Sequence, residues 1–190
     1  LLCQCCKVGA LLVVDEAYYP FYDKTILNGS FEDKDNLLVV RTFSKAWGLA
    51  GLRIGYVCSS VANINSLKKV RSIHEVNNLA IVCASMLIDH FSIMTDYVKT
   101  VKAGREVLKN SIESLGLTYL PCYGNFTLIR VGNICEPDIL QRELKKMGYL
   151  VKAGFESECI DDCIRVTLAG PEIMSEFLKS LKKAVKYAQR

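Results

Sequence analysis

The order of apolar and polar residues divides the chain into a strand-rich first part and a second part in which helices alternate with strands. Two continuous apolar runs, within Ala10–Asp15 and Leu37–Thr42, are short enough for buried parallel strands, and the first ends in a carboxylate. The residue pattern over Arg53–Cys58 predicts a third strand. The segment Tyr18–Asn36 is rich in Tyr, Asp, Asn and Gly and predicts a loop with one short helical turn.

Helical periodicity begins after the third strand. It predicts helices over Asn63–Val70, Leu79–His90 and Thr95–Leu115, the last of which ends at a glycine. The remaining residues predict three short strands and two helices that open with proline: Phe126–Val131, Pro137–Met147, Tyr149–Lys152, Ile164–Leu168 and Pro171–Ala188. We therefore expect an α/β part followed by an α+β part of about 100 residues.

Composition excludes several classes of protein. Of 190 residues, 51% are hydrophobic and 23% charged, and the mean hydropathy is +0.20, so the chain can bury a core and is not a disordered tail. The net charge of +4 is spread along the sequence rather than gathered in a basic stripe, which argues against a nucleic-acid-binding protein. No apolar run reaches the 18 residues of a membrane span.

Nine cysteines and two histidines give no metal-site pattern. The groups Cys3-x-Cys5-Cys6 and Cys159-x3-Cys163 are not two matched pairs at zinc spacing, so we expect no metal. Most of the other cysteines lie in apolar patterns, where a thiol acts as a small hydrophobic group, and this usage favours the reducing cytoplasm. The sequence begins without Met and within an apparent element, so we expect it to be a fragment of a longer protein.

Polar residues of varied chemistry are concentrated in two short stretches, Asp15–Tyr18 (DEAY) and Thr42–Arg53 (TFSKAWGLAGLR). The carboxyl ends of strands in α/β sheets face ligand sites. A partly desolvated amine such as that of Lys45 can attack carbonyl groups, and hydroxyls beside a guanidinium can bind phosphate. Taken singly, each residue has a plainer interpretation, with Asp15 as a helix cap and Lys45 as a solvated lysine.

The same glycines do not form a dinucleotide-binding loop. Gly48, Gly51 and Gly55 precede a predicted strand, whereas the dinucleotide fingerprint requires a helix at that place. Their use is more simply explained by a turn whose backbone approaches a ligand.

The two stretches together resemble the pyridoxal-phosphate-dependent aminotransferases of fold type I, and most closely the histidinol-phosphate aminotransferase branch. The motif DEAY is followed 24 residues later by TFSKAWGLAGLRIGY, which ends at Tyr56. The resemblance continues through Val76-Asn77-x-Leu-Ala80, Gly104-Arg105-x2-Leu108, Asn125-Phe126 and Arg165-Val-Thr, and so covers essentially the whole chain.

This resemblance implies a role for each matching residue. Lys45 would link covalently to the aldehyde of pyridoxal phosphate and then shuttle a proton as base and acid. Asp15 would pair with the pyridine nitrogen and Tyr18 with the phenolic oxygen, while Thr42, Ser44 and Arg53 would hold the phosphate. The expected substrate-binding residues are Arg165, which would clamp a carboxylate, together with Lys152 and Asn125.

The resemblance also implies an architecture. Residues 1–90 would be the C-terminal part of the cofactor-binding large domain, with Arg53–Cys58 antiparallel to its neighbour, and residues 91–190 would be an α+β small domain. The expected assembly is a homodimer in the cytoplasm that acts on an amino acid and a 2-oxo acid. The family's N-terminal half has no counterpart before Leu1, and its loss would leave strand edges and apolar faces open near Ala10–Asp15.

Two positions depart from the family pattern. Lys152 stands where an arginine is usual, which keeps the charge but loses the bidentate fork and puts recognition of a substrate phosphate in doubt. The segment that usually reads Pro-Tyr-Asn-Val-Asn is here Ile73-His74-Glu75-Val76-Asn77, where the histidine is more simply a loop or dimer-contact residue than a catalytic acid.

Three functions remain open from the sequence. The first is a transaminase of which this chain is the C-terminal half. The second is a truncated, non-catalytic chain that folds or dimerises without turnover. The third is a pyridoxal-phosphate-dependent decarboxylase of the same branch, which would share every motif named above.

Overall fold

The computed structural model describes residues 1–27, 29 and 34–189. The chain divides into two units, Leu1–Thr95 and Asp96–Arg190, and the boundary falls within one long helix, α5 (Phe91–Ile112). The predicted loop Tyr18–Asn36 includes residues 28 and 30–33, which lie outside the described residues. Its expected helical turn is α2 (Tyr19–Tyr22).

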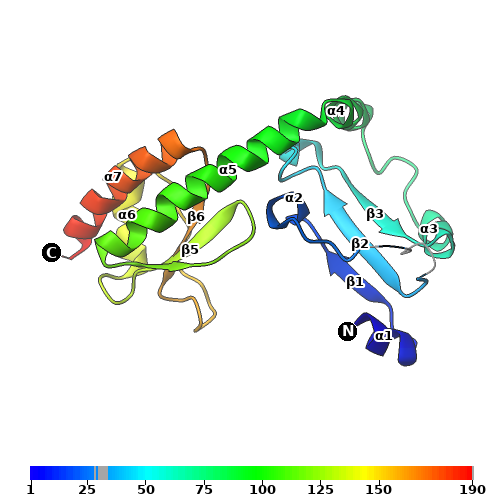
Figure 1. Cartoon of the computed structure of the whole chain (residues 1–190), viewed down its shortest axis with the longest axis horizontal. Coiled ribbons are helices and arrows are strands. Elements are labelled where there is room, and N and C mark those ends of the chain that lie inside the picture. Colours follow the sequence, from blue (N-terminus) through cyan, green and yellow to red (C-terminus); the bar gives the residue numbers. More distant parts are fainter. Residues whose placement is uncertain (28, 30–33, 190) are drawn as a thin grey trace. The chain divides into compact units, whose positions relative to one another are not determined.

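The first unit is built on a three-stranded sheet in the order β1-β2-β3 (Figure 1). Strand β1 (Leu12–Asp15) runs parallel to β2 (Leu37–Thr42), and β3 (Gly55–Ser59) runs antiparallel to β2, as expected for this segment. Because β1 and β2 are parallel, their carboxyl ends lie at one edge of the sheet. That edge carries the two sequence stretches with candidate chemistry.

Burial in this sheet is uneven. The first three residues of β2 are buried, with Leu37 and Val39 almost inaccessible. In contrast, Val13 on β1 is 58% exposed and Val57 on β3 is 37% exposed. The two outer strands each pair with β2 alone among the described strands, so the expected open strand edges are present.

The helices of the first unit are short, and two of them begin at a polar side chain that caps the helix. A helix that was not expected, α1 (Leu2–Lys7), precedes β1. Ser60 caps α3 (Val61–Lys68), and the Asn77 side chain accepts a hydrogen bond of 2.8 Å from the Ala80 N–H at the start of α4 (Asn78–Asp89). Taken singly, no helix among the described residues has both the length and the apolar character to cross a membrane.

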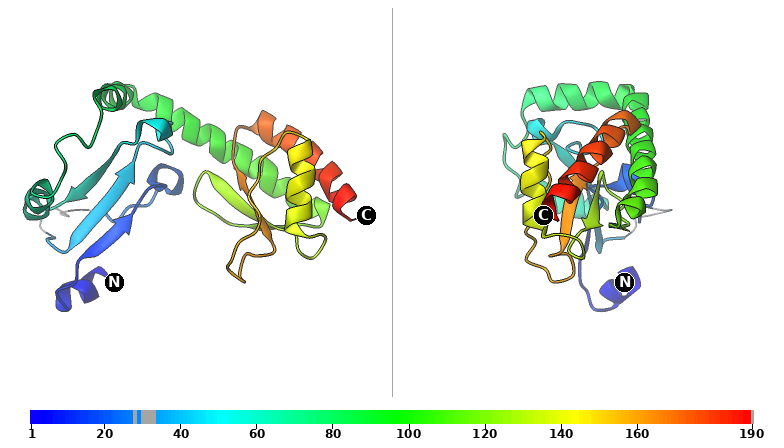
Figure 2. Two further views of the ribbon diagram at one scale, coloured as in Figure 1. Left: turned by 180° about the vertical axis from the view of Figure 1, so that it is seen from behind. Right: turned by 90° about the vertical axis from the view of Figure 1, so that its left-hand side faces the viewer.

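The second unit is an α+β arrangement. Its sheet has the order β4-β5-β6 and is antiparallel throughout, with bounds β4 (Thr118–Leu120), β5 (Phe126–Arg130) and β6 (Cys163–Thr167). Helix α5 ends in a short 3₁₀ turn, η2 (Glu113–Leu115). Helices α6 (Pro137–Lys146) and α7 (Pro171–Ala188) lie side by side (Figure 2).

Alternation along β5 and β6 separates the two faces of this sheet. Thr127, Ile129, Ile164 and Val166 are buried on one face, whereas Arg165 on the opposite face is exposed. Thr127 is a buried polar residue, and its hydroxyl donates a hydrogen bond of 3.0 Å to the Leu120 carbonyl. The expected pairing of Phe126–Val131 with Ile164–Leu168 is confirmed, and it places Arg165 on the open face.

The strand expected over Tyr149–Lys152 is wrong. In this segment only Lys152 forms a bridge, opposite Arg165 on β6, and the third strand of the sheet is β4, which pairs with β5 at the other edge. Gly148 and Gly154 adopt positive φ angles of 88° and 67°, so the chain turns at both ends of this segment and only one residue stays aligned with β6.

Candidate active site

Asp15 and Tyr18 lie where β1 ends. Asp15 is the last residue of β1 and is exposed, and its Oδ1 accepts a hydrogen bond of 2.9 Å from the Ala17 N–H. The carboxylate therefore stabilises the turn that follows the strand and does not cap a helix. Tyr18 is the residue before α2, whose first turn contains Pro20.

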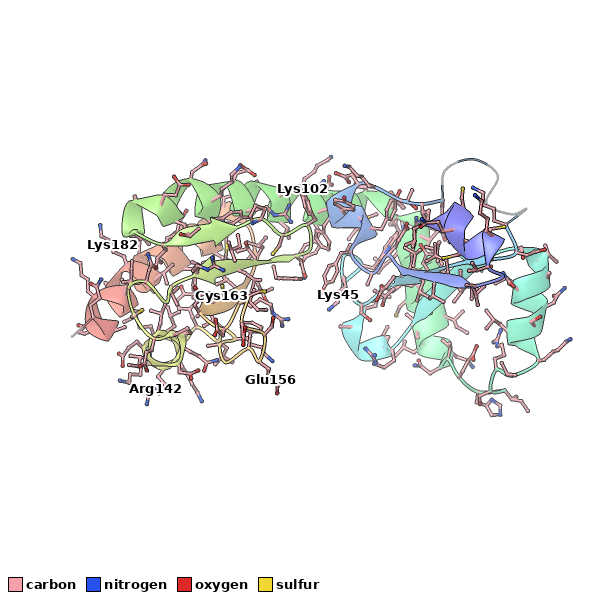
Figure 3. All side chains as sticks on the ribbon, turned by 90° about the horizontal axis from the view of Figure 1, so that it is seen from below. Lys45, Lys102, Arg142, Glu156, Cys163 and Lys182 are labelled. Carbon is pink, nitrogen blue, oxygen red and sulfur yellow. The ribbon has the colours of Figure 1, made fainter. Side chains whose placement is uncertain are left out.

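Lys45 lies in the turn that follows β2 and is half-buried (Figure 3). Its Nζ is 5.3 Å from the centroid of the Tyr18 ring, although the two residues are 27 positions apart in the sequence. The parallel pairing of β1 with β2 brings them together, because both follow strand ends at the same edge of the sheet. An amine and a phenol thus meet beside the strand that ends in Asp15.

Thr42 and Ser44 are joined within one turn. The Thr42 Oγ1 accepts a hydrogen bond of 3.0 Å from the Ser44 N–H, and the Phe43 N–H donates to the Ile54 carbonyl at 3.1 Å. Thr42 is paired with Gly55 on β3, at a place where an added Cβ would lie 2.7 Å from the Arg41 carbonyl oxygen. The absence of a side chain at Gly55 therefore permits this close strand pairing.

Arg53 lies just before that pairing with a left-handed backbone, φ 55°, which is uncommon for a residue with a Cβ. Its Nη1 donates a hydrogen bond of 3.1 Å to the Ala50 carbonyl, and the residue is exposed. The turn after β2 thus presents two hydroxyls and, close in sequence, a guanidinium that leaves most of its donors to solvent or a ligand.

Aromatic packing that was not expected supports this turn. The Phe43 ring centroid lies 5.4 Å from that of Trp47 and 5.6 Å from that of Tyr56, and Trp47 meets Phe91 edge-on at 5.4 Å. Lys45 lies between Phe43 and Trp47 in sequence, so the backbone on both sides of the lysine is fixed by ring contacts.

A buried ion pair that sequence reasoning missed lies directly beside Asp15. Glu16 Oε2 is 2.8 Å from Arg41 Nη2, and the side chains are only 8% and 16% exposed, respectively. Glu16 also accepts hydrogen bonds from the Thr25 hydroxyl at 2.8 Å and the Ile26 N–H at 2.7 Å, while the guanidinium lies 3.8 Å from the Tyr19 ring centroid. The pair ties β1, β2 and the loop after α2 together.

These contacts decide the charge of both partners. Burial alone would raise the pKa of Glu16, but hydrogen bonds from Ile26, Arg41 and Thr25 outweigh it and hold the pKa below its usual value. Burial likewise opposes the charge of Arg41, but its bonds to Glu16 and Tyr56 raise its pKa overall. Both groups are therefore charged at neutral pH.

The second unit brings together Lys152 and Arg165. Each residue donates its N–H to the carbonyl of the other, at 3.1 Å and 2.7 Å, in an antiparallel bridge. Residues directly opposite one another in such a pair project from the same face, so both cationic side chains lie on the open face of the sheet. The Arg165 guanidinium is 5.4 Å from the Phe126 ring centroid, and Lys152 Nζ is 5.6 Å from that of Phe155.

Asn125 lies at the start of β5, beside these residues. Its carbonyl accepts a hydrogen bond of 2.8 Å from the Leu168 N–H, which follows β6. The sequence-predicted residues thus form two groups, with Asp15, Tyr18, Thr42, Ser44, Lys45 and Arg53 in the first unit and Asn125, Lys152 and Arg165 in the second.

Cys163 on β6 of the second unit is a buried thiol (Figure 3). Burial and the neighbouring Asp162 carboxylate raise the pKa of Cys163 to about 11, so this thiol is protonated and poorly nucleophilic at neutral pH. Over the described ranges, no three His, Cys, Asp or Glu side chains gather closely enough to hold a metal ion.

Comparison with known proteins gives consistent matches. Residues 2–181 match the family model described as aminotransferase class I and II. Histidinol-phosphate aminotransferase 1 of Idiomarina loihiensis is 35% identical over 178 residues, which are 91% of this chain and 47% of that protein. The chain spans about half the length of the curated relatives it matches.

Solved structures give the same picture and confirm the predicted fold class. Histidinol-phosphate aminotransferase from Sinorhizobium meliloti, solved in complex with pyridoxal-5'-phosphate, matches with a TM-score of 0.83 at 25% identity, over 93% of this chain and 49% of that one. L-threonine-O-3-phosphate decarboxylase from Porphyromonas gingivalis has a TM-score of 0.79 at 23% identity, over 92% and 55%, and shares the fold.

Proposed function

The chain belongs to the class I and II aminotransferases, and from this we propose that it is the lysine-bearing C-terminal half of a pyridoxal-phosphate-dependent transaminase. The proposed reaction exchanges an amino group between an amino acid, or histidinol phosphate, and a 2-oxo acid. Residues 1–90 are assigned to the cofactor-binding large domain and residues 91–190 to the small domain.

One observation carries this proposal. The Lys45 amine lies 5.3 Å from the Tyr18 ring, in the turn after β2, while Asp15 ends the neighbouring parallel strand. A nucleophilic amine, a phenol and a carboxylate at one sheet edge are the groups that transamination needs close together.

The residues of the first unit suit pyridoxal phosphate. The cofactor offers an aldehyde for an amine, a ring nitrogen for a carboxylate, a phenolic oxygen for a hydroxyl donor and a phosphate for hydroxyls and a guanidinium. Lys45, Asp15 and Tyr18 supply the first three partners, and Thr42, Ser44 and Arg53 supply the last. When bound, the cofactor supplies an electron sink for the substrate carbon that loses its proton.

Each residue of the proposed site then has a defined role. Lys45 removes the proton from the substrate Cα and later returns a proton as the acid. Asp15 holds a proton on the ring nitrogen, and Tyr18 donates a hydrogen bond to the phenolic oxygen. In the second unit, Arg165 binds the substrate carboxylate through its planar fork, assisted by Asn125, and Lys152 acts as a cation for a second anionic group of the substrate.

We propose a homodimer in the cytoplasm as the working form of the complete enzyme. All nine cysteines are free thiols, which fits a reducing compartment.

Covalent trapping tests the proposal without requiring turnover. The 190-residue chain is mixed with pyridoxal phosphate, reduced with borohydride and digested, and the modified lysines are identified by mass. We expect selective modification of Lys45 and its loss in Lys45→Arg. Lys24 is a matched control, because its Nζ also lies over a tyrosine ring, 5.5 Å from the Tyr22 centroid, and Lys24→Arg should not change the labelling. Weak labelling of all lysines would instead indicate a non-catalytic chain.

Lys45→Ala tests the catalytic role in the intact enzyme. Removal of the amine takes away the group that moves the proton, so we expect the transamination rate to fall by about three orders of magnitude or more. The Lys45→Ala variant should still bind the cofactor through its phosphate. Residual transamination above a few per cent would contradict the assignment.

Product analysis of the unmodified enzyme tests the alternative reaction. Release of carbon dioxide in place of a 2-oxo acid product would identify a decarboxylase.

A further inference from the structure

Arg105 is a charged residue on the inner face of α5 that the proposed function leaves unused. The buried stripe of this helix runs through Val101, Leu108 and Ile112, and Arg105 lies on its border. Its Nη2 donates a hydrogen bond to the Gly124 carbonyl, and its Nε is buried without a hydrogen-bond partner among the described residues. Burial of a guanidinium costs free energy, so we expect Arg105 to have a specific role at this position.

The carbonyl that Arg105 holds belongs to the turn that leads into β5. Asn125 follows directly and accepts the Leu168 N–H at 2.8 Å, which joins this turn to the segment after β6. Phe126 comes next, and its ring lies against the Arg165 guanidinium, with 5.4 Å between the guanidinium carbon and the ring centroid. Phe126 and Arg165 are diagonal neighbours on the open face of the sheet.

Gly104, the residue before Arg105, brings α5 against the loop that follows β6. A Cβ added to Gly104 would lie 1.9 Å from the Ala169 carbonyl oxygen. Only glycine therefore allows the helix backbone to approach the loop that follows β6 this closely. Gly104 and Arg105 together fix both chain segments that flank the paired ends of β5 and β6.

We propose that Arg105 is a positioning residue for anion binding by Arg165 and Asn125. It restrains the Gly124–Phe126 turn, and the turn places both the Asn125 side chain and the ring against which Arg165 packs. The inference rests on the proposed role of Arg165 in binding a substrate carboxylate. It adds a residue that touches neither substrate nor cofactor.

Nuclear magnetic resonance of the 190-residue chain measures this positioning directly. The Arg165 Nε–Hε signal senses the ring current of Phe126, and Phe126→Leu defines the signal without it. In Arg105→Met, which keeps the aliphatic part but removes every donor, we expect the Arg165 signal to move most of the way to that of Phe126→Leu and hydrogen exchange of the Leu168 amide to accelerate. An unchanged Arg165 signal and an unchanged Leu168 exchange rate in a folded Arg105→Met chain would overturn the proposal.

Arg130→Met is the matched control. Arg130 lies on β5 of the same sheet, pairs with Asp162 at 2.8 Å and donates to the Cys159 carbonyl at 3.0 Å. Its removal deletes a guanidinium from the same face of the sheet without touching the Gly124 turn, so the Arg165 signal should move much less than in Arg105→Met and not toward that of Phe126→Leu. If Arg105→Met fails to fold, Arg105→Lys decides: one cationic donor suffices for one carbonyl, so this variant should retain the Arg165 signal, and its loss would overturn the proposal.

Titration with succinate separates this inference from the proposed function. We expect Arg105→Met to weaken succinate binding about tenfold and Arg165→Met to abolish it. If the unmodified chain and Arg165→Met respond alike to succinate, the proposed role of Arg165 is wrong. The positioning role of Arg105 is then still judged by the Arg165 signal in the absence of ligand.

Discussion

Glu16 neighbours the proposed catalytic residue Asp15, and its carboxylate is bound to Arg41, to the Thr25 hydroxyl and to the Ile26 N–H. Glu16→Gln keeps the shape but removes the charge, and leaves the Arg41 guanidinium partly buried without its counter-ion. We expect the free energy of unfolding at pH 7 to fall by about 2–3 kcal/mol in urea denaturation. Glu75→Gln is the control, because Glu75 and Arg71 form an exposed pair at 2.6 Å, and it should cost less than about 0.5 kcal/mol.

The pKa of Glu16 also fixes the sign of the pH dependence. Since the folded chain holds this pKa below its usual value of 4.5, the stabilisation is present above that pH and is lost as the pH falls through the folded-state pKa. The stability difference between the unmodified chain and Glu16→Gln should therefore shrink in acid below about pH 4.5. A difference that stayed constant down to pH 3 would show that the charge of Glu16 is not the source of the effect.

Arg165 and Lys152 lie opposite one another, yet they should contribute differently to substrate binding. Arg165→Ala in the intact enzyme leaves a substrate carboxylate unpaired, which costs about 2–5 kcal/mol, so KM should rise steeply for every amino acid tested.

Lys152→Arg supplies a planar fork and should selectively improve the kinetics of a phosphorylated substrate such as histidinol phosphate. Paired kinetics on one phosphorylated and one plain amino acid decide this, and equal effects on both would mean that Lys152 does not face the distal group.

Residue chemistry could be inferred from the sequence only where a motif carries it. Asp15, Tyr18 and Lys45 stand in compact motifs, and the structure brings the lysine amine to the tyrosine ring. The Glu16–Arg41 pair spans 25 positions and depends on the register between β1 and β2, which the residue pattern does not specify. The support of the turn by Phe43 and Trp47 was missed for the same reason, since ring contacts require three-dimensional placement.

At the scale of elements, the apolar pattern of the sequence predicted the strands and helices that have a clear buried face. The strand Leu37–Thr42 and the helix Pro171–Ala188 have the expected bounds. The strand begins with four consecutive apolar residues, and the helix is opened by proline and carries an apolar stripe. The strand expected at Tyr149–Lys152 is wrong, since flanking glycines turn the chain away from β6. Strand β4 was missed because its three residues, none of them buried, are too few to show an alternation of apolar and polar positions.

The packing of α5 gives a prediction at this scale. In Gly104→Ala the new Cβ would meet the Ala169 carbonyl oxygen at 1.9 Å, so either the helix or the loop after β6 must move. We expect the free energy of unfolding to fall by about 3 kcal/mol in urea denaturation. Gly51→Ala is the control, because no atom lies within 4 Å of an added Cβ and its φ is not positive, so it should change stability by less than about 0.5 kcal/mol. A cost at Gly104 no larger than at Gly51 would contradict the close packing.

At the scale of the whole molecule, the two units differ in how much apolar surface they bury. In the first unit many large apolar side chains are exposed, among them Val13 on β1 and Leu79, Ile81, Val82 and Met86 on α4. In the second unit the buried residues form a core around β5, β6 and α7, and few large apolar side chains are exposed among the described residues. Large exposed apolar patches mark surfaces that another polypeptide covers.

The proposed function assigns that cover to the half of the relatives that this chain does not match. We predict that adding a polypeptide with that half of the Idiomarina loihiensis relative will slow hydrogen exchange in β1 and β3, lower the fluorescence of a hydrophobic dye and increase borohydride labelling of Lys45. Val13→Asp should abolish these effects, because it puts a charge on an open strand edge. Ile173→Asp on α7 is the matched control, since Ile173 is 54% exposed against 58% for Val13, and it should leave them intact. If exchange, dye fluorescence and labelling all stay unchanged on mixing, this prediction is wrong and the open strand edges have another use.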